Sequence, residues 1–118
     1  MKILLTGFEA FGDVEENPTQ VIVEHLAKSN NLPNHVKLIC EILPVEYEAS
    51  GHCIRELIET HKPDAVIMTG VAASRQKINV EFWARNHRTA KIPDNSGVLL
   101  QDQPVNPAFP IEHFLPST

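Results

Sequence analysis

The chain has 118 residues, of which 42% are hydrophobic, and a formal net charge of −5 at pH 7. This length fits one domain, and the apolar fraction is too high for a disordered chain. The acidic balance argues against nucleic acid or an anionic membrane as partner, because both need a positively charged protein face. No run approaches the roughly 18 apolar residues of a membrane span, and the first apolar run is too short for the core of a signal peptide and lacks a cleavage site. We expect a cytoplasmic protein that binds neither nucleic acid nor membrane.

Three short apolar runs, residues 2–6, 36–42 and 65–69, predict strands, since each is closed by a glycine or a proline-containing turn. Two helical segments separate them. The first begins at Asn17 and Pro18, a favourable cap followed by a favourable first helical residue. The second spans residues 46–61 and is amphipathic. The apolar faces predicted for the two helices are Val21, Ile22 and Leu26, and Ala49, Cys53, Ile54, Leu57 and Ile58.

Alternation of strands and helices predicts an α/β fold, a three-layer sandwich around a largely parallel twisted sheet with right-handed crossovers. Apolar and polar residues alternate over 78–84 and predict a further strand. Residues 101–118 hold four prolines and predict an irregular tail after an ordered core of residues 1–100. We therefore expect one domain whose fold is incomplete at its C-terminus.

Cofactor chemistry finds little support in the sequence. The loop Gly7–Gly12 is followed by Asp13, where a phosphate-binding loop of the Walker type needs a lysine. The six histidines show no zinc-ligand spacing, so we expect no metal and no cofactor. Cys40 and Cys53 fall on predicted apolar positions and are interpreted as core residues rather than a disulfide or a reactive thiol.

We expect a ligand-binding or catalytic site in the loops that follow the carboxyl ends of the strands, because open α/β sheets bind ligands there. After the first strand, Phe8 and Phe11 stand between glycines and offer either an apolar ligand wall or a cover for the sheet end. Glu81 lies in the alternating segment and could orient a catalytic histidine. The alternatives are an outward-facing strand residue or an ion pair with Arg75 or Arg85.

The ordered motifs of the chain resemble the N-terminal half of the pyroglutamyl peptidase I (pyrrolidone-carboxylate peptidase) family. Residues 6–12 read Thr-Gly-Phe-Glu-Ala-Phe-Gly, and residues 17–19 read Asn-Pro-Thr. The similarity continues in order through Leu43-Pro44-Val45, Pro63-Asp64, Gly70, Ala72, Arg75, Ile78, Glu81, Ala84, Asn86, Ile92-Pro93-Asp94-Asn95 and Gly97, with weaker matches at Asp102 and Pro104.

The resemblance implies a cytosolic cysteine exopeptidase that removes N-terminal pyroglutamate from peptides and forms oligomers. By position in the motifs, Glu81 matches the family's carboxylate that orients the base histidine. The ring-binding side chains would be Phe8, Phe11, Val45 and Ile92, with Arg75 and Asn86 in support.

Members of this family are nearly twice as long as this chain, and their nucleophile cysteine and base histidine lie in the second half. Cys40 and Cys53 do not match the nucleophile, nor do His87 and His113 match the base. We therefore expect the chain to be inactive alone. The alternatives are a non-catalytic binding or assembly module that retains the aromatic pocket, and a small domain whose own chemistry uses Glu81 with His87.

Overall fold

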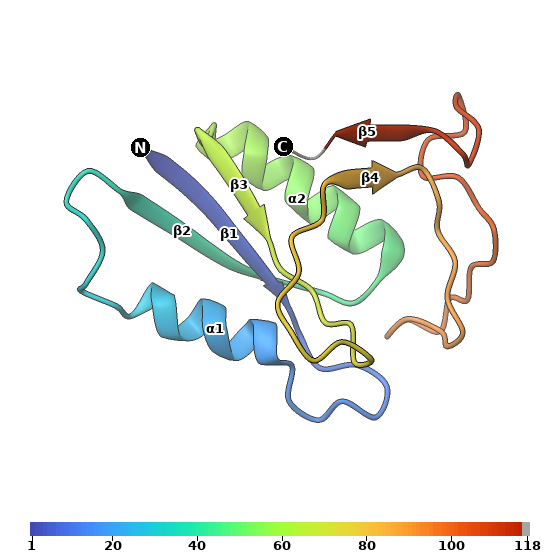
Figure 1. Cartoon of the computed structure of the whole chain (residues 1–118), viewed down its shortest axis with the longest axis horizontal. Coiled ribbons are helices and arrows are strands. Elements are labelled where there is room, and N and C mark those ends of the chain that lie inside the picture. Colours follow the sequence, from blue (N-terminus) through green and yellow to red (C-terminus); the bar gives the residue numbers. More distant parts are fainter. Residues whose placement is uncertain (117–118) are drawn as a thin grey trace. The chain divides into compact units, whose positions relative to one another are not determined.

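The computed structural model describes residues 1–116 and contains two compact units, Met1–Val71 and a second that starts at Ala72. The first unit holds three strands and two helices, and the second holds two short strands joined by long irregular segments (Figure 1). No helix within residues 1–116 is long and apolar enough to cross a membrane.

A parallel three-stranded sheet forms the centre of the first unit, in the order β2-β1-β3. Its strands are β1 (Lys2–Phe8), β2 (Lys37–Leu43) and β3 (Ala65–Met68). The central strand β1 contributes Leu4 and Leu5, which are 0% and 4% exposed. The prediction of an α/β fold around a parallel sheet is confirmed, with strand boundaries that differ from the predicted ones by at most two residues.

Helices α1 (Pro18–Ala27) and α2 (Tyr47–His61) connect these strands. The chain passes from β1 to β2 on one side of β1 and then returns past β1 to β3 on the other. Crossovers between parallel strands are right-handed as a rule, and with that handedness this reversal puts the two helices on opposite faces of the sheet (Figure 1). The reversal also makes the carboxyl end of β1 the switch point at which such sheets bind ligands.

The cap of α1 is as predicted, but the buried face of the helix is not. Asn17 Oδ1 accepts hydrogen bonds from Thr19 N at 3.0 Å and Thr19 Oγ1 at 2.8 Å. Val21 and Ile22 are 44% and 45% exposed, whereas Val23 is 2% exposed. The cause is a close approach at Gly7, where a Cβ would lie 2.7 Å from the Thr19 carbonyl oxygen. The helix therefore presents the face that begins at Thr19 to β1.

The second helix is less covered than its amphipathic pattern predicts. Of the five predicted apolar positions, Cys53, Ile54 and Leu57 are half-buried, whereas Ala49 and Ile58 are exposed. No residue of α2 is fully buried. Cys40 on β2 is also only half-buried, so the interpretation of both cysteines as core residues was too strong.

The second unit contains an antiparallel pair of strands, β4 (Trp83–Arg85) and β5 (Phe114–Pro116). The predicted strand over 78–84 is wrong for residues 78–82, which belong to no strand. The predicted irregular tail, 101–118, contains β5, while its last two residues lie outside the described part of the chain. A proline is tolerated in β5 because a strand with one neighbour leaves one backbone edge free of ladder bonds.

The irregular segment that leads to β5 is organised by one buried amide. Asn86 is 9% exposed, and its Nδ2 donates to the carbonyl oxygens of Asn106, Phe109 and Pro110 at 3.0, 2.9 and 3.0 Å. Its Oδ1 accepts from Asn106 N at 2.7 Å, and its backbone N–H donates to His113 O at 3.0 Å. One side chain thus satisfies backbone groups that no regular element pairs.

Candidate functional site

The loops that follow β1 and β2 are joined through Glu9. Its backbone N–H donates to Leu43 O at 3.2 Å, and its Oε1 accepts from Val45 N at 3.2 Å. Asn17 Nδ2 donates to Glu9 O at 3.0 Å, which ties the same loop to the start of α1. The sequence did not single out Glu9 as a site residue, although its place in the glycine-flanked loop was a signal.

Phe8 and Phe11 are both half-buried at this end of the sheet. Phe8 N donates to Thr19 Oγ1 at 2.9 Å, and Val14 N donates to Phe11 O at 2.8 Å. Gly12, at φ +53°, closes the turn in a backbone conformation that glycine adopts without strain. The backbone that carries both rings is therefore fixed by hydrogen bonds, while the rings retain access to solvent.

Glu81 forms an ion pair with Arg75, one of the alternatives that the sequence left open. Arg75 Nη1 lies 2.5 Å from Glu81 Oε1, and the side chains are 49% and 66% exposed. A pair this exposed contributes about 0–1 kcal/mol to stability, because water screens both charges. The guanidinium orients the carboxylate, and a carboxylate is a hydrogen-bond acceptor of the kind that an imidazole N–H can use.

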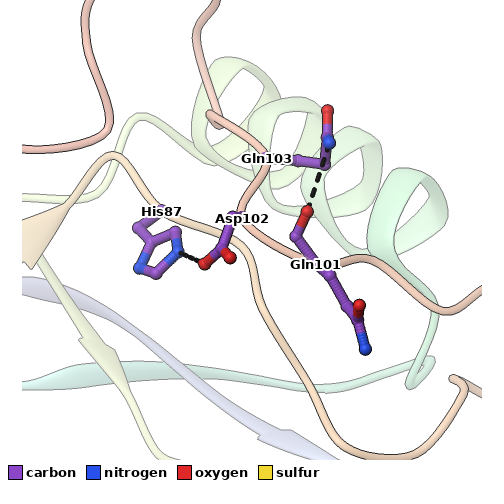
Figure 2. A network of polar contacts seen from close by, with 4 residues as sticks. All are labelled: His87, Gln101, Asp102 and Gln103. Atoms are coloured by element: carbon purple, nitrogen blue, oxygen red, sulfur yellow. Dashed lines mark hydrogen bonds and ion pairs between the residues drawn. The ribbon is translucent and has the colours of Figure 1, made fainter.

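His87 pairs with Asp102, a contact that the sequence analysis did not identify (Figure 2). The ring Nε2 lies 2.8 Å from Asp102 Oδ1, and the two side chains are 16% and 73% exposed. Asp102 has φ +50°, in the left-handed region. The neighbours Arg88 and Gln103 exchange backbone hydrogen bonds of 2.7 and 3.0 Å, so the contact between His87 and Asp102 closes the base of a hairpin.

The turn of this hairpin follows Ile92, whose side chain is 51% exposed. Asp94 Oδ1 accepts from the backbone N–H groups of Ser96 and Val98 at 3.0 and 2.9 Å, and Gly97 has φ +86°. These contacts preform the turn. An exposed apolar residue beside a rigid turn is available to a ligand without further ordering of the backbone.

The thiols of Cys40 and Cys53 are not activated. Burial raises the pKa of Cys40 above its ordinary value. Burial also raises the pKa of Cys53, and the charges of Glu41 and Glu56 raise it further. A nucleophilic thiol needs the opposite environment, one that lowers its pKa.

A shallow hollow of about 350 Å³ is lined by Glu41, Cys53, Glu56, Leu57, Thr60 and His61. His61 lies eight residues from Cys53 on α2, too far along the helix for the facing positions three or four residues apart. Among the described residues, no group of three or more His, Cys, Asp or Glu could hold a metal ion.

The predicted site residues are divided between the two units. The first unit contains Phe8, Phe11 and Val45. Val45 lies close to Phe8 in this unit, because Val45 N donates a hydrogen bond to the side chain of Glu9, the residue that follows Phe8. The remaining four, Arg75, Glu81, Asn86 and Ile92, belong to the second unit. Arg75 and Glu81 are in contact, whereas Asn86 binds the Pro-rich segment.

Comparison with known proteins shows the family to which this chain belongs. The family model described as pyroglutamyl peptidase matches residues 1–116. The pyrrolidone-carboxylate peptidases of Pyrococcus furiosus and Thermococcus kodakarensis are 35% and 38% identical, each over 97% of this chain and 54% of their own length. The enzyme of Gloeobacter violaceus is 37% identical over 97% of this chain and 55% of its own.

The solved structures agree with the sequences. The crystal structure of the P. furiosus pyrrolidone carboxyl peptidase superposes with a TM-score of 0.86 over 97% of this chain and 54% of that chain. The chain belongs to the pyroglutamyl peptidase family, whose members are cysteine peptidases. It spans about half the length of the curated relatives that it matches.

Proposed function

We propose that this chain forms the part of a pyroglutamyl peptidase that binds the pyroglutamyl ring of a peptide and carries the carboxylate that orients the base. The observation that carries the proposal is the match of the family model to residues 1–116. The activity itself is named for the relatives, each of which is about twice as long as the matched region.

Ring binding would use Phe8, Phe11 and Val45 of the first unit, and the place of Ile92 in the family motif gives it the same proposed role in the second unit. A pyroglutamyl ring is a neutral lactam, so it is best held by apolar walls and a few hydrogen bonds. The rigid backbone around Phe8 and Phe11 and the preformed turn after Ile92 support this role, because neither loop needs to be ordered on binding.

Glu81 would act on the base through a hydrogen bond to its ring N–H, as the carboxylate does in other nucleophile–histidine–carboxylate arrangements. Arg75 holds Glu81 in one orientation through the ion pair between them. Arg75 and Asn86 are positioning residues in this scheme, since neither would touch the reacting atoms.

We also propose that this chain alone does not hydrolyse pyroglutamyl peptides. Catalysis by a cysteine peptidase begins with a thiolate, and both thiols of this chain have raised pKa values. The proposal places the protein in the cytoplasm, as a homo-oligomer that uses peptide substrates and no metal. Sedimentation of the purified chain tests the oligomer.

Titration calorimetry tests the ring site directly. We expect the purified chain to bind a pyroglutamyl dipeptide more tightly than the prolyl dipeptide of otherwise identical sequence, because proline lacks the lactam carbonyl. Phe8→Ala should weaken binding at least tenfold, whereas Val21→Ala, at an exposed position on α1, should not. Equal affinity for the two dipeptides would contradict the proposal.

A second candidate is a non-catalytic assembly module. Exposed apolar side chains in the second unit favour it, because Ile78 and Val80 are 95% and 70% exposed. The same titration separates the two functions. An oligomer in solution that binds neither dipeptide would support assembly without ligand binding.

A further inference from the structure

Glu9 extends the pairing of β1 with β2 beyond the last residues of the two strands. The strands run parallel and end with the pair Phe8 and Leu43, so their carboxyl ends lie at the same edge of the sheet (Figure 1). Glu9 N then donates to Leu43 O at 3.2 Å. The residue after Leu43 is Pro44, which has no backbone N–H with which to continue the ladder. Beyond Pro44, the loop after β2 therefore needs a different partner to stay in place.

The side chain of Glu9 supplies that partner at Val45. Glu9 Oε1 accepts a hydrogen bond from Val45 N at 3.2 Å, although the two residues are 36 positions apart in the sequence. Both residues are half-buried, so the bond is partly shielded from water. A hydrogen bond to a carboxylate is stronger than one to a neutral acceptor. The first backbone N–H after Pro44 is therefore bound to the residue that follows Phe8.

The backbone of Glu9 is anchored in turn to the start of α1. Asn17 Nδ2 donates to Glu9 O at 3.0 Å, and Asn17 Oδ1 accepts from Thr19 Oγ1 at 2.8 Å. Thr19 Oγ1 accepts from Phe8 N at 2.9 Å. Asn17 and Thr19 are 1% and 5% exposed, and a buried network whose members are hydrogen-bonded to one another is rigid. A continuous set of hydrogen bonds thus links the backbone of Phe8 to that of Val45, and Glu9 is its last member before Val45.

We propose that Glu9 is a positioning residue of the ring site, whose carboxylate holds Val45 in place beside Phe8 before a ligand binds. The inference rests on the proposed function, in which Phe8 and Val45 contact the pyroglutamyl ring. Glu9 acts through Val45 and does not touch the ring itself. Its contribution is to affinity, because a loop that has to be ordered on binding loses conformational entropy at that moment, whereas a loop already held in place does not.

Amide exchange of the ligand-free chain tests the hydrogen bond itself. Glu9→Ala removes the acceptor, so exchange at Val45 N should accelerate by about tenfold. Exchange at Leu4 and Leu5, in the buried part of β1, should remain that of the wild type. Glu9→Gln retains an acceptor oxygen and should restore most of the protection. Glu16→Ala, at an exposed position in the same loop, is the matched control and should leave exchange at Val45 unchanged.

Titration calorimetry of the same variants with a pyroglutamyl dipeptide tests the consequence for the ring site. Glu9→Ala should weaken binding by about tenfold, whereas Glu9→Gln and Glu16→Ala should bind nearly as the wild type does.

Three results would overturn the proposal: unchanged exchange at Val45 in Glu9→Ala, wild-type affinity of that variant, or no recovery of affinity in Glu9→Gln. Faster exchange at Leu4 and Leu5 together with Val45 would also overturn it, because Glu9 would then stabilise the whole unit rather than position one loop. A wild-type chain that binds the pyroglutamyl and prolyl dipeptides equally would contradict the proposed function. Exchange at Val45 would still decide whether Glu9 holds the loop.

Discussion

Different interactions stabilise the interior of each unit: apolar burial in the first and hydrogen bonds to a buried amide in the second. Among residues 1–116, the buried hydrophobic side chains are Leu4, Leu5, Val23 and Leu43, and all of them lie in the first unit. In the described part of the second unit the buried residue is Asn86, which acts through hydrogen bonds, and large side chains such as Trp83 are 61% exposed. Cavities in the apolar core should therefore destabilise the first unit most, whereas loss of buried hydrogen bonds should destabilise the second unit most.

The largest expected effect is a cavity in the first unit. Leu4→Ala should lower the free energy of unfolding by about 2–5 kcal/mol, because Leu4 is 0% exposed and the site cannot collapse fully. Urea unfolding followed by circular dichroism measures it. Val21→Ala, at a 44% exposed position, is the matched control and should cost much less. Equal losses for the two variants would contradict the assignment of the core to β1.

The corresponding change in the second unit is Asn86→Ala. We expect a loss of about 2–3 kcal/mol, since the variant leaves three carbonyl oxygens and one N–H without their partner. Amide exchange should accelerate near Asn106 and His113. Asn86→Asp retains an acceptor but no donor and should be no better than alanine. A variant that unfolds like wild type would remove Asn86 as the organising residue.

Loss of the cap of α1 should have a smaller effect. Asn17→Ala removes the acceptor for Thr19 N and Oγ1 and the donor to Glu9 O, at a cost of about 1–2 kcal/mol. Asn17→Asp keeps the acceptor and should recover most of the loss. If the aspartate variant were as unstable as the alanine variant, the bond to Glu9 would be the dominant contact.

One change in the first unit should stabilise it. Thr6 is 0% exposed, and its Oγ1 has no hydrogen-bond partner among the described residues. Thr6→Val keeps the shape and removes the buried hydroxyl, so we expect a gain of about 1 kcal/mol. Thermal unfolding measures the shift. A destabilised valine variant would show that the hydroxyl is satisfied in solution.

The smallest expected effect concerns the thiols. Because the pKa values of Cys40 and Cys53 are raised, the thiolate fraction at neutral pH is below that of an ordinary cysteine. Alkylation by iodoacetamide at pH 7.5 should therefore be slower in the folded chain than in urea, and should accelerate with rising pH beyond pH 9. Glu56→Gln should speed the reaction of Cys53 and leave Cys40 unchanged. Faster alkylation in the folded chain would contradict the direction of these shifts.

The first unit was predicted from the sequence more accurately than the second. Strand runs, the Asn17 cap and the strand–helix order were local signals, and they predicted the parallel sheet correctly. The buried face of α1 was missed because a close approach at Gly7, remote in sequence from Val23, selects it. In the second unit, the alternation over 78–84 predicted a strand, but a strand also needs a partner, and residues 78–82 have none within the described chain.

Among the site residues, the ion pair of Glu81 with Arg75 was one of two alternatives, and sequence alone could not choose between Arg75 and Arg85. His87 contacts Asp102, 15 residues further along the chain, because a hairpin brings them together. No local sequence pattern predicted that hairpin. The roles of Phe8, Phe11, Val45 and Ile92 in ring binding remain predictions.

The central claim is that this chain belongs to a cysteine peptidase family but carries no active thiol of its own. Release of coumarin from a pyroglutamyl-coumarin substrate tests it most directly, with the wild-type chain, Cys40→Ser and Cys53→Ser assayed side by side in reducing buffer. The account predicts no turnover above buffer for any of the three. Thiol-dependent turnover by the wild-type chain that either serine variant abolishes would contradict it.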